Sequence, residues 1–149
     1  MLDSTSVKIV TDNSQLGSIH RLRFEILRKP LGLSFESAAF PEDNLETTVH
    51  VIASSASGLV GCATLLISES ESAIQLRGMA VAHNLQGTGV GRLIVLASHD
   101  FARQARKSLW CQARESAIGF YECLGWVATG TLFEIPVIGS HRKMEWRPE

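Results

Sequence analysis

The stretch that decides the fold is residues 76–104, LRGMAVAHNLQGTGVGRLIVLASHDFARQ. It begins as an apolar, strand-like segment that ends near Val81, and it continues through the glycine-rich turn 86–92. Apolar residues with helical spacing, among them Leu93 and Leu96, follow the turn. A helix that starts directly after such a turn has free backbone N–H groups, and glycines remove the side chains that would block a ligand. The stretch therefore predicts a phosphate-binding strand, turn and helix.

Two common phosphate-binding loops do not fit this turn. A Walker-type loop requires Gly-Lys-Ser/Thr, whereas Gly91 is followed by Arg92. A dinucleotide fingerprint requires a third glycine at position 92 and an acidic residue near Gln112, and the chain has neither. The pattern that remains is Gln-x-x-Gly-x-Gly, formed by Gln86, Gly89 and Gly91.

The chain has 149 residues, a net charge of −1, and 45% hydrophobic and 19% charged residues. These values predict one folded domain over residues 1–149. The near-neutral charge argues against nucleic acid or an anionic membrane as a partner. Cys62, Cys111 and Cys123 have no metal-ligand spacing and suit no disulfide framework, so we expect a reduced, cytoplasmic protein without a metal. Apolar runs are far shorter than the about 18 residues of a membrane span.

The order of the elements predicts a mixed α/β domain. Helices are expected between Gln15 and Pro30, from the glycine turn to about Gln104, and over residues 116–124 with Ser116 as its cap. The strand, helix and strand around the glycine turn imply a parallel crossover, and the strands before it imply an antiparallel meander. The expected strands are residues 7–10, 48–53, 59–68, 73–81, 108–112, 126–133 and 140–146.

Three local features carry further expectations. Asp12 and Gln15 have the spacing of a capping box at the start of the first helix. The charged residues of that helix, including Arg23, are expected on a solvated face. Residues 31–46 are expected to form an irregular loop with one helical turn, either covering a substrate site or serving as a connector. Gly78, inside a strand, indicates a bulge or a close backbone approach.

The motifs together resemble the GNAT superfamily of N-acetyltransferases. Met79-Ala80-Val81 precedes the Gln-x-x-Gly-x-Gly motif, and ARESAIGFYECLGW follows at residues 113–126. The resemblance extends from about Val49 onward, and the tail at residues 135–144 is similar to the last strand region of small bacterial members. It implies a mixed, mostly antiparallel central sheet of about six or seven strands flanked by helices.

The resemblance also implies acetyl-CoA as cosubstrate. Its pyrophosphate is expected on the backbone N–H groups of the glycine turn, and its pantetheine arm along the preceding strand, paired with it like an added strand. Many relatives have Asn where this chain has Arg114, which could reach a phosphate, contact the acceptor or lie on the surface. The implied cofactor-binding residues are Met79, Ala80, Val81, Gln86, Gly87, Thr88, Gly89, Val90, Gly91, Arg92, Arg114 and Ala117.

Acyl transfer to an amine needs a base, an oxyanion donor and an acid for the departing thiolate. Tyr121 matches the family tyrosine that protonates the sulfur, although composition alone would make it a packing aromatic. Glu134 and His141 are the first candidates for the general base, ahead of His50 and His83, and a base acting through water is a further option. A backbone N–H near residues 79–81 is the expected oxyanion donor.

These features predict direct acetyl transfer to a primary amine of a small molecule or peptide, in a ternary complex and without a metal. A chain of this type can also form a homodimer. Cys111 or Cys123 as an acyl carrier is the rival mechanism. The rival function is a non-catalytic domain that binds an acyl-CoA as a sensor or regulator.

Overall fold

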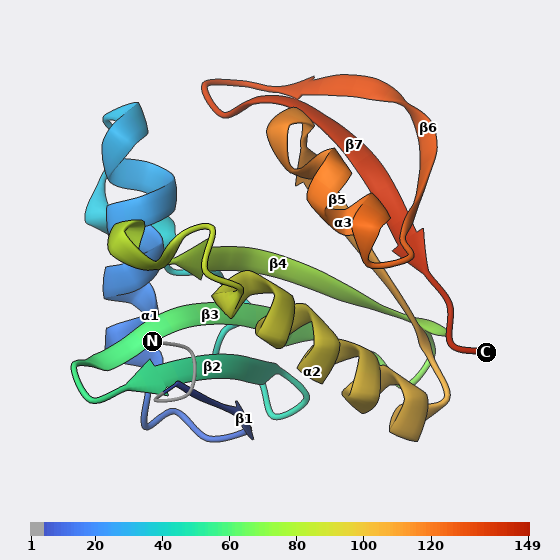
Figure 1. Cartoon of the computed structure of the whole chain (residues 1–149), viewed down its shortest axis with the longest axis horizontal. Coiled ribbons are helices and arrows are strands. Elements are labelled where there is room, and N and C mark those ends of the chain that lie inside the picture. The colour runs from blue at the N-terminus through green and yellow to red at the C-terminus, as the bar shows by residue number, and fades with distance from the viewer. Residues whose placement is uncertain (1–4) are drawn as a thin grey trace.

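The computed structural model describes residues 5–149, and its strands and helices follow the expected order (Figure 1). Three 3-10 turns, η3 (Lys29–Leu31), η4 (Phe35–Ala38) and η5 (His83–Leu85), lie in the connections, and η6 (Glu115–Ala117) precedes the last helix. The helical elements are α1 (Leu16–Arg23), its π-helical continuation η2 (Phe24–Arg28), α2 (Val90–Ala105) and α3 (Ile118–Cys123). The strands are β1 (Ser6–Val10), β2 (Val49–Ser55), β3 (Gly58–Leu66), β4 (Ala73–Val81), β5 (Ser108–Arg114), β6 (Val127–Ile135) and β7 (Gly139–Trp146).

The strands form a seven-stranded sheet in the order β1-β2-β3-β4-β5-β7-β6. Only β4 and β5 pair in parallel among the strand pairs of residues 5–149, and the other neighbours are antiparallel. This arrangement confirms the mixed, mostly antiparallel α/β fold, including the parallel crossover through α2.

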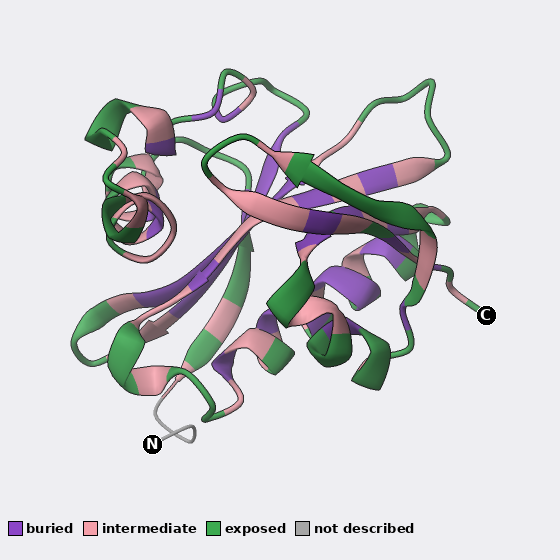
Figure 2. Ribbon diagram, turned by 90° about the horizontal axis from the view of Figure 1, so that it is seen from above, coloured by how far each residue is buried: buried purple, intermediate pink, exposed green. Residues whose placement is uncertain are grey.

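Helices pack on both faces of the sheet, which explains why its central strands are mostly apolar. In β2, Val51 joins the core beneath α2, whereas the next residue, Ile52, packs with Ile19 of α1 on the opposite face. Successive side chains of a strand point to opposite faces, so a strand covered on both sides has no polar face. Buried residues accordingly follow the central strands and the inner sides of the helices (Figure 2).

Strands β4 and β5 separate soon after they begin to pair. Their parallel register covers only residues 73–75 of β4 and 108–110 of β5. Beyond this point the two strands diverge, with α1 on one side and the β6–β7 hairpin and α3 on the other (Figure 1). The edge of β4 that faces β5 therefore has no strand partner from residue 76 onward within residues 5–149.

Two expected helix caps are wrong. The residue before α1 is Gln15, whose side chain makes no cap hydrogen bond, and Asp12 instead accepts hydrogen bonds from the N–H and hydroxyl of Ser14. Helix α3 follows Ala117 without a side-chain cap, so Ser116 does not cap it either. In both cases a short turn precedes the helix, and Asp12 accepts its hydrogen bonds within that turn instead of capping α1.

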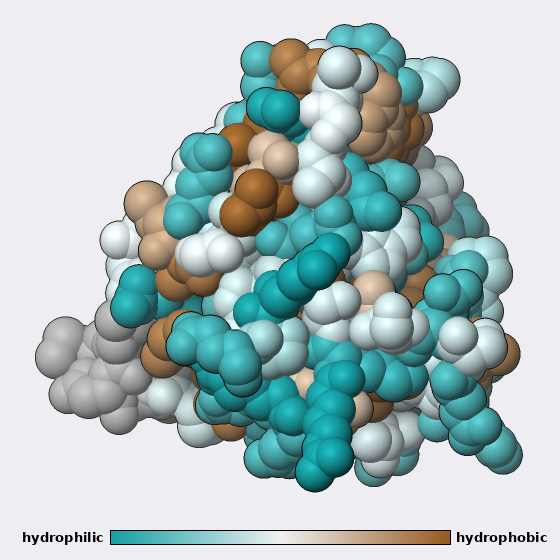
Figure 3. Space-filling model, turned by 90° about the vertical axis from the view of Figure 1, so that its right-hand side faces the viewer, coloured by the Kyte–Doolittle hydropathy of each residue, from teal (hydrophilic) through white to brown (hydrophobic). Residues whose placement is uncertain are grey.

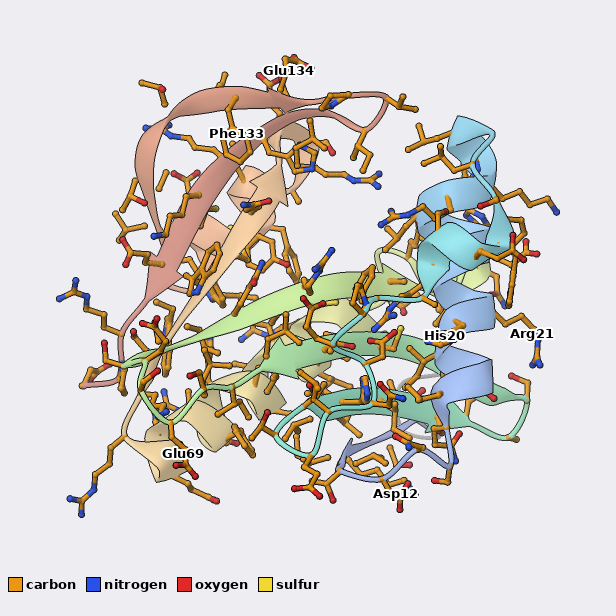
Figure 4. All side chains as sticks on the ribbon, turned by 180° about the vertical axis from the view of Figure 1, so that it is seen from behind. Asp12, His20, Arg21, Glu69, Phe133 and Glu134 are labelled. Carbon is orange, nitrogen blue, oxygen red and sulfur yellow. The ribbon has the colours of Figure 1, made fainter. Side chains whose placement is uncertain are left out.

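The expectation of a solvated charged face on the first helix is wrong for Arg23. Its side chain is 1% exposed and binds both carboxylate oxygens of Asp43, with N–O distances of 2.7 and 2.8 Å. His20 also contacts Asp43, at 2.8 Å, whereas Arg21 projects away from the sheet (Figure 4). The reason is tertiary, because Asp43 lies in the loop 31–46, which folds back over the helix and supplies the counter-charge.

Candidate active site

A cavity of about 450 Å³ opens where β4 and β5 separate. Residues 75–79 of β4 form one wall, and residues 110–114 of β5 form the other. Helix α3, the end of the first helix and the β6–β7 turn close its sides. Together with the loop 31–46, η6 and β7, they contribute Leu27, Arg28, Phe40, Ala117, Phe120, Tyr121, Ile135, Ile138 and His141.

Tyr121 lies in this cavity, held by α3, and its side chain is 5% exposed. Its ring packs 5.0 Å from that of Trp126, and its hydroxyl interacts with the Cys111 thiol. Burial, together with Cys111, raises the pKa of Tyr121 above its usual range, so the hydroxyl remains protonated at neutral pH. Tyr121 is therefore a proton donor inside the cavity.

Neither candidate acyl-carrier cysteine has a favourable environment. Burial raises the pKa of Cys111 to about 12, which leaves almost no thiolate at neutral pH. Cys123 is exposed and lies outside the cavity lining, and it is not the small core residue that the sequence led us to expect. Cys123 is the last residue of the short helix α3, and its side chain faces solvent.

The structure separates the two leading candidates for the base. His141 lines the cavity, and its Nδ1 donates a hydrogen bond to the Gly139 carbonyl at 2.8 Å. This bond leaves Nε2 as the basic nitrogen of the neutral ring. Glu134 is exposed at the outer edge of β6 and accepts a hydrogen bond from Ser140, outside the cavity lining (Figure 4).

The other two candidate histidines for the base, His50 and His83, lie away from the cavity lining. His50 is 1% exposed and is bonded to Thr64 and to the Asp43 carbonyl. Burial lowers its pKa, so it is a neutral residue of the protein interior. His83 lies in η5, just before the glycine turn.

The glycine turn has the backbone conformation of an anion site. Gly89, with φ of +100°, precedes α2, which has no side-chain cap. The N–H of Leu93 bonds to the Gly89 carbonyl, so the N–H groups of Val90, Gly91 and Arg92 form the free first turn of a sixteen-residue helix. They suit the pyrophosphate of a coenzyme A.

The side chains of the turn mostly brace it. The Gln86 amide donates to the Val81 carbonyl at 3.0 Å, which ties the turn to β4. The Thr88 hydroxyl donates to the Leu85 carbonyl at 2.6 Å, so its oxygen is available as an acceptor while its proton is used. Gly87 has a φ of +79°, and a Cβ there would meet nothing within 4 Å. Its backbone is open to an approaching ligand.

Strand β4 is distorted next to the cavity. Gly78 has a φ of +68°, and the register of β4 with β3 shifts between Cys62 and Thr64. A Cβ at Gly78 would lie 2.9 Å from both Arg23 Nε and Phe40 Cε2. The prediction of a bulge is confirmed, and the close neighbours of Gly78 are the side chains of Arg23 and Phe40.

Met79 is the residue of the expected pantetheine strand that lines the cavity. Ala80 is buried on the α1 face, and Val81 lies 3.8 Å from the position of a Cβ on Gly91. The glycine turn therefore sits directly beside the end of β4. This contact joins the expected phosphate site to the expected pantetheine edge.

Comparison with known proteins agrees with this geometry. Residues 46–128, more than half of the chain, match the model of the acetyltransferase (GNAT) domain family. The chain is 33% identical to the uncharacterized N-acetyltransferase YitI of Bacillus subtilis (strain 168) over 129 residues, which cover 82% of this chain and 85% of that protein. The chain belongs to the GNAT family of acetyltransferases.

Solved structures show the same GNAT fold. An acyl-CoA N-acyltransferase from Pseudomonas aeruginosa superimposes with a TM-score of 0.83 at 16% identity, covering 97% of this chain and 100% of that one. An aminoglycoside 6'-N-acetyltransferase complexed with coenzyme A gives a TM-score of 0.73 at 15% identity, covering 95% and 99%. The family makes this chain an N-acetyltransferase that uses an acyl-CoA, and the sensor alternative is not favoured.

Arg114 and Ala117, expected to help bind the GNAT cosubstrate, lie in the cavity lining, which includes none of residues 86–92. The Arg114 guanidinium donates to the Leu27 carbonyl at 3.4 Å, between the two arms of the open sheet. Arg28 and Arg77, which line the same cavity, were not predicted from the sequence as site residues. Arg77 is the one charged residue of β4, a signal that alone does not distinguish a ligand contact from a solvated strand face.

The described part of the chain contains no helix long and apolar enough to cross a membrane. It also contains no group of three or more His, Cys, Asp or Glu side chains placed to hold a metal ion.

Proposed function

We propose that this GNAT protein transfers the acetyl group of acetyl-CoA directly to a primary amine of a small molecule or peptide, within a ternary complex. The observation that supports this proposal most strongly is that Tyr121 and His141 line one cavity beside the unpaired edge of β4. A proton donor and a proton acceptor are thereby available at one site.

In this proposal the glycine turn binds the pyrophosphate through the free N–H groups of Val90, Gly91 and Arg92. The pantetheine arm pairs with the free edge of β4 and carries the thioester past Met79 into the cavity. Arg92 adds positive charge at the turn. The contact between Gly91 and Val81 supports a continuous path from the turn to the strand.

The chemistry needs two proton transfers. The amine nitrogen attacks the thioester carbonyl carbon, and a backbone N–H near residue 79 stabilises the oxyanion. A carbon–nitrogen bond forms, the carbon–sulfur bond breaks, and the departing thiolate takes the hydroxyl proton of Tyr121. The proton of the amine passes to His141 Nε2 and returns to Tyr121 through solvent, so the products are the acetylated amine and free coenzyme A.

An assay of free thiol with acetyl-CoA and a panel of amines tests the proposal. We expect Tyr121→Phe to lower kcat by about 10²-fold, because general acid catalysis contributes this order, while the Kd for acetyl-CoA stays the same. An unchanged kcat would remove the acid role. Acetyl-CoA binding without transfer to any amine would instead support the sensor alternative.

Two variants, His141→Gln and Glu134→Gln, test which residue is the general base. His141→Gln is expected to lower kcat, because His141 Nε2 is the proposed proton acceptor in the cavity. Glu134→Gln is expected to have little effect, because Glu134 lies outside the cavity lining. The reverse pattern would make Glu134 the base.

The homodimer and the cytoplasmic location remain predictions from the sequence. Strand β6 is at the edge of the sheet, and large exposed hydrophobic side chains lie along it and in the following turn. These are Val127, Leu132, Phe133 and Val137. Figure 3 shows the side of the molecule on which β6 lies in Figure 1, and hydrophobic residues are interspersed among hydrophilic ones on its upper part. The molar mass in solution, from light scattering, tests the dimer.

A further inference from the structure

The cavity is positively charged although the chain is not. Arg28 at the end of η2, Arg77 in β4 and Arg114 at the end of β5 come from distant parts of the sequence and line the same cavity. The lining also contains His141 and no aspartate or glutamate. Since the net charge of the chain is −1, this local excess of positive charge is a property of the cavity.

These arginines are only partly used by the protein itself. Among residues 5–149, Arg28 and Arg114 form no ion pair and donate only to carbonyl oxygens, at 3.3 to 3.4 Å. Arg77 stacks on the Phe40 ring at 3.9 Å and lies 3.7 Å from Glu42. A guanidinium has five N–H donors, so most of this donor capacity remains open.

Arg23 provides the contrast within the same region. Its guanidinium is held by Asp43 in a bidentate pair and also donates to the Ala38 carbonyl, and it does not line the cavity. Arg23 is a structural arginine with its counter-ion built in. Among residues 5–149, Arg28 and Arg114 have no carboxylate partner, and Arg77 has only the longer, single contact with Glu42 at 3.7 Å.

Placing like charges together in a half-buried site is unfavourable unless an anion compensates them. Burial lowers the pKa of Arg28, and the positive charges of Arg114, Arg77 and Arg23 lower it further. Planar guanidinium groups bind carboxylates and phosphates with two parallel hydrogen bonds. A bound anion would therefore relieve the repulsion and fill the open donors.

We propose that the acceptor is a small amine that also carries an anionic group, bound by Arg28, Arg77 and Arg114. The inference rests on the proposed acetyl transfer to an amine. The acceptor is small because a cavity of about 450 Å³ must hold both it and the thioester end of the cosubstrate. The anion belongs to the acceptor because residues 86–92, the expected pyrophosphate site, contribute nothing to this lining.

The test compares acceptors that differ only in charge. Wild-type enzyme is assayed with free amino acids against their carboxamides, and with phosphoethanolamine against ethanolamine. We expect kcat/KM about ten- to a hundredfold higher for the anionic member of at least one pair, the range for a hydrogen-bonded charge. The two pairs distinguish a carboxylate from a phosphate.

Variants show which arginines bind the anionic group of the acceptor. Arg28→Gln and Arg114→Gln are expected to raise KM for the preferred anionic acceptor at least about tenfold and to leave KM for its neutral partner unchanged. Arg28→Gln is also expected to leave the Kd for acetyl-CoA unchanged. Arg21→Gln is the matched control, because Arg21 projects from the same helical region away from the sheet (Figure 4). Thermal unfolding of each variant shows that the fold is retained.

The outcomes separate the two proposals. Loss of acetyl transfer to every amine would remove the proposed function itself. Transfer with equal efficiency to charged and neutral amines would overturn only the anionic acceptor. A rise in the Kd for acetyl-CoA in Arg28→Gln would also overturn it, because Arg28 would then serve the cosubstrate.

Discussion

Replacing Asp43 by asparagine is expected to destabilise both the fold and the acceptor side of the cavity. The carboxylate accepts two hydrogen bonds from Arg23, one from His20 and one from the N–H of Phe40. Burial alone would raise the pKa of Asp43, but the bonds and charge of Arg23 hold it below its usual range. Asp43 is thus the anion on which the buried Arg23 depends.

The magnitude follows from the burial of the pair. Asp43 and Arg23 are 4% and 1% exposed, so Asp43→Asn leaves a guanidinium charge without compensation inside the protein. Removing one partner of a buried pair costs about 3–5 kcal/mol. Since the substituted amide keeps one acceptor oxygen, we expect a loss near the lower value, about 3 kcal/mol. With a urea m-value of about 1.5 kcal/mol/M, the unfolding midpoint falls by about 2 M.

Equilibrium urea unfolding followed by circular dichroism measures this loss. Glu46→Gln is the matched control, because Glu46 is an exposed acid of the same loop and should change the midpoint little. The double variant Arg23→Met with Asp43→Leu is expected to recover much of the stability, since an apolar pair leaves no buried charge. A loss below about 1 kcal/mol in Asp43→Asn, or a double variant less stable than the single one, would refute this reasoning.

Three further changes have defined outcomes. Burial, with the charge of Arg103, lowers the pKa of His99 from 6.5 to about 4, so its neutral form stabilises the fold above pH 6.5. That contribution, about 3 kcal/mol, is lost as the pH falls from 6.5 towards 4, and urea unfolding should show a flatter pH dependence in His99→Asn. Gly78→Ala is expected to cost about 1–3 kcal/mol, measured by urea unfolding, because its φ is positive and its Cβ collides with neighbours; an unchanged midpoint would contradict this. Gly89→Val should weaken acetyl-CoA binding at least about tenfold by calorimetry while the protein stays folded, and an unchanged Kd would remove the turn from the cofactor site.

The strands and the glycine turn could be predicted because their signals are local. The expected strand at residues 73–81 matches β4, and the helix after the turn matches α2 with its end one residue further on. Gly78 was correctly placed at a distortion, since an interior glycine marks the site whatever the neighbours are. Caps were less predictable, because Asp12 has a competing local partner in Ser14 and a 3-10 turn, η6, precedes α3.

Charged residues were the weakest part of the prediction. Periodicity placed Arg23 among solvated charges, but its environment depends on Asp43, twenty residues later. In the same way, nothing in the sequence distinguishes Arg28 or Arg77 from surface arginines. His141 and Glu134 could not be ranked until the structure placed only one of them beside Tyr121.

The sequence by itself determined the family, the order of the elements and the glycine turn before α2, because glycines, periodicity and motif spacing act over a few residues. Only the tertiary structure decided where β4 and β5 separate, which arginines share the cavity and which one is neutralised inside the protein. Those features depend on contacts between residues distant in the chain, and on burial, which sets the energy of a charge. The order of residues in the sequence shows neither these long-range contacts nor the burial of each charge.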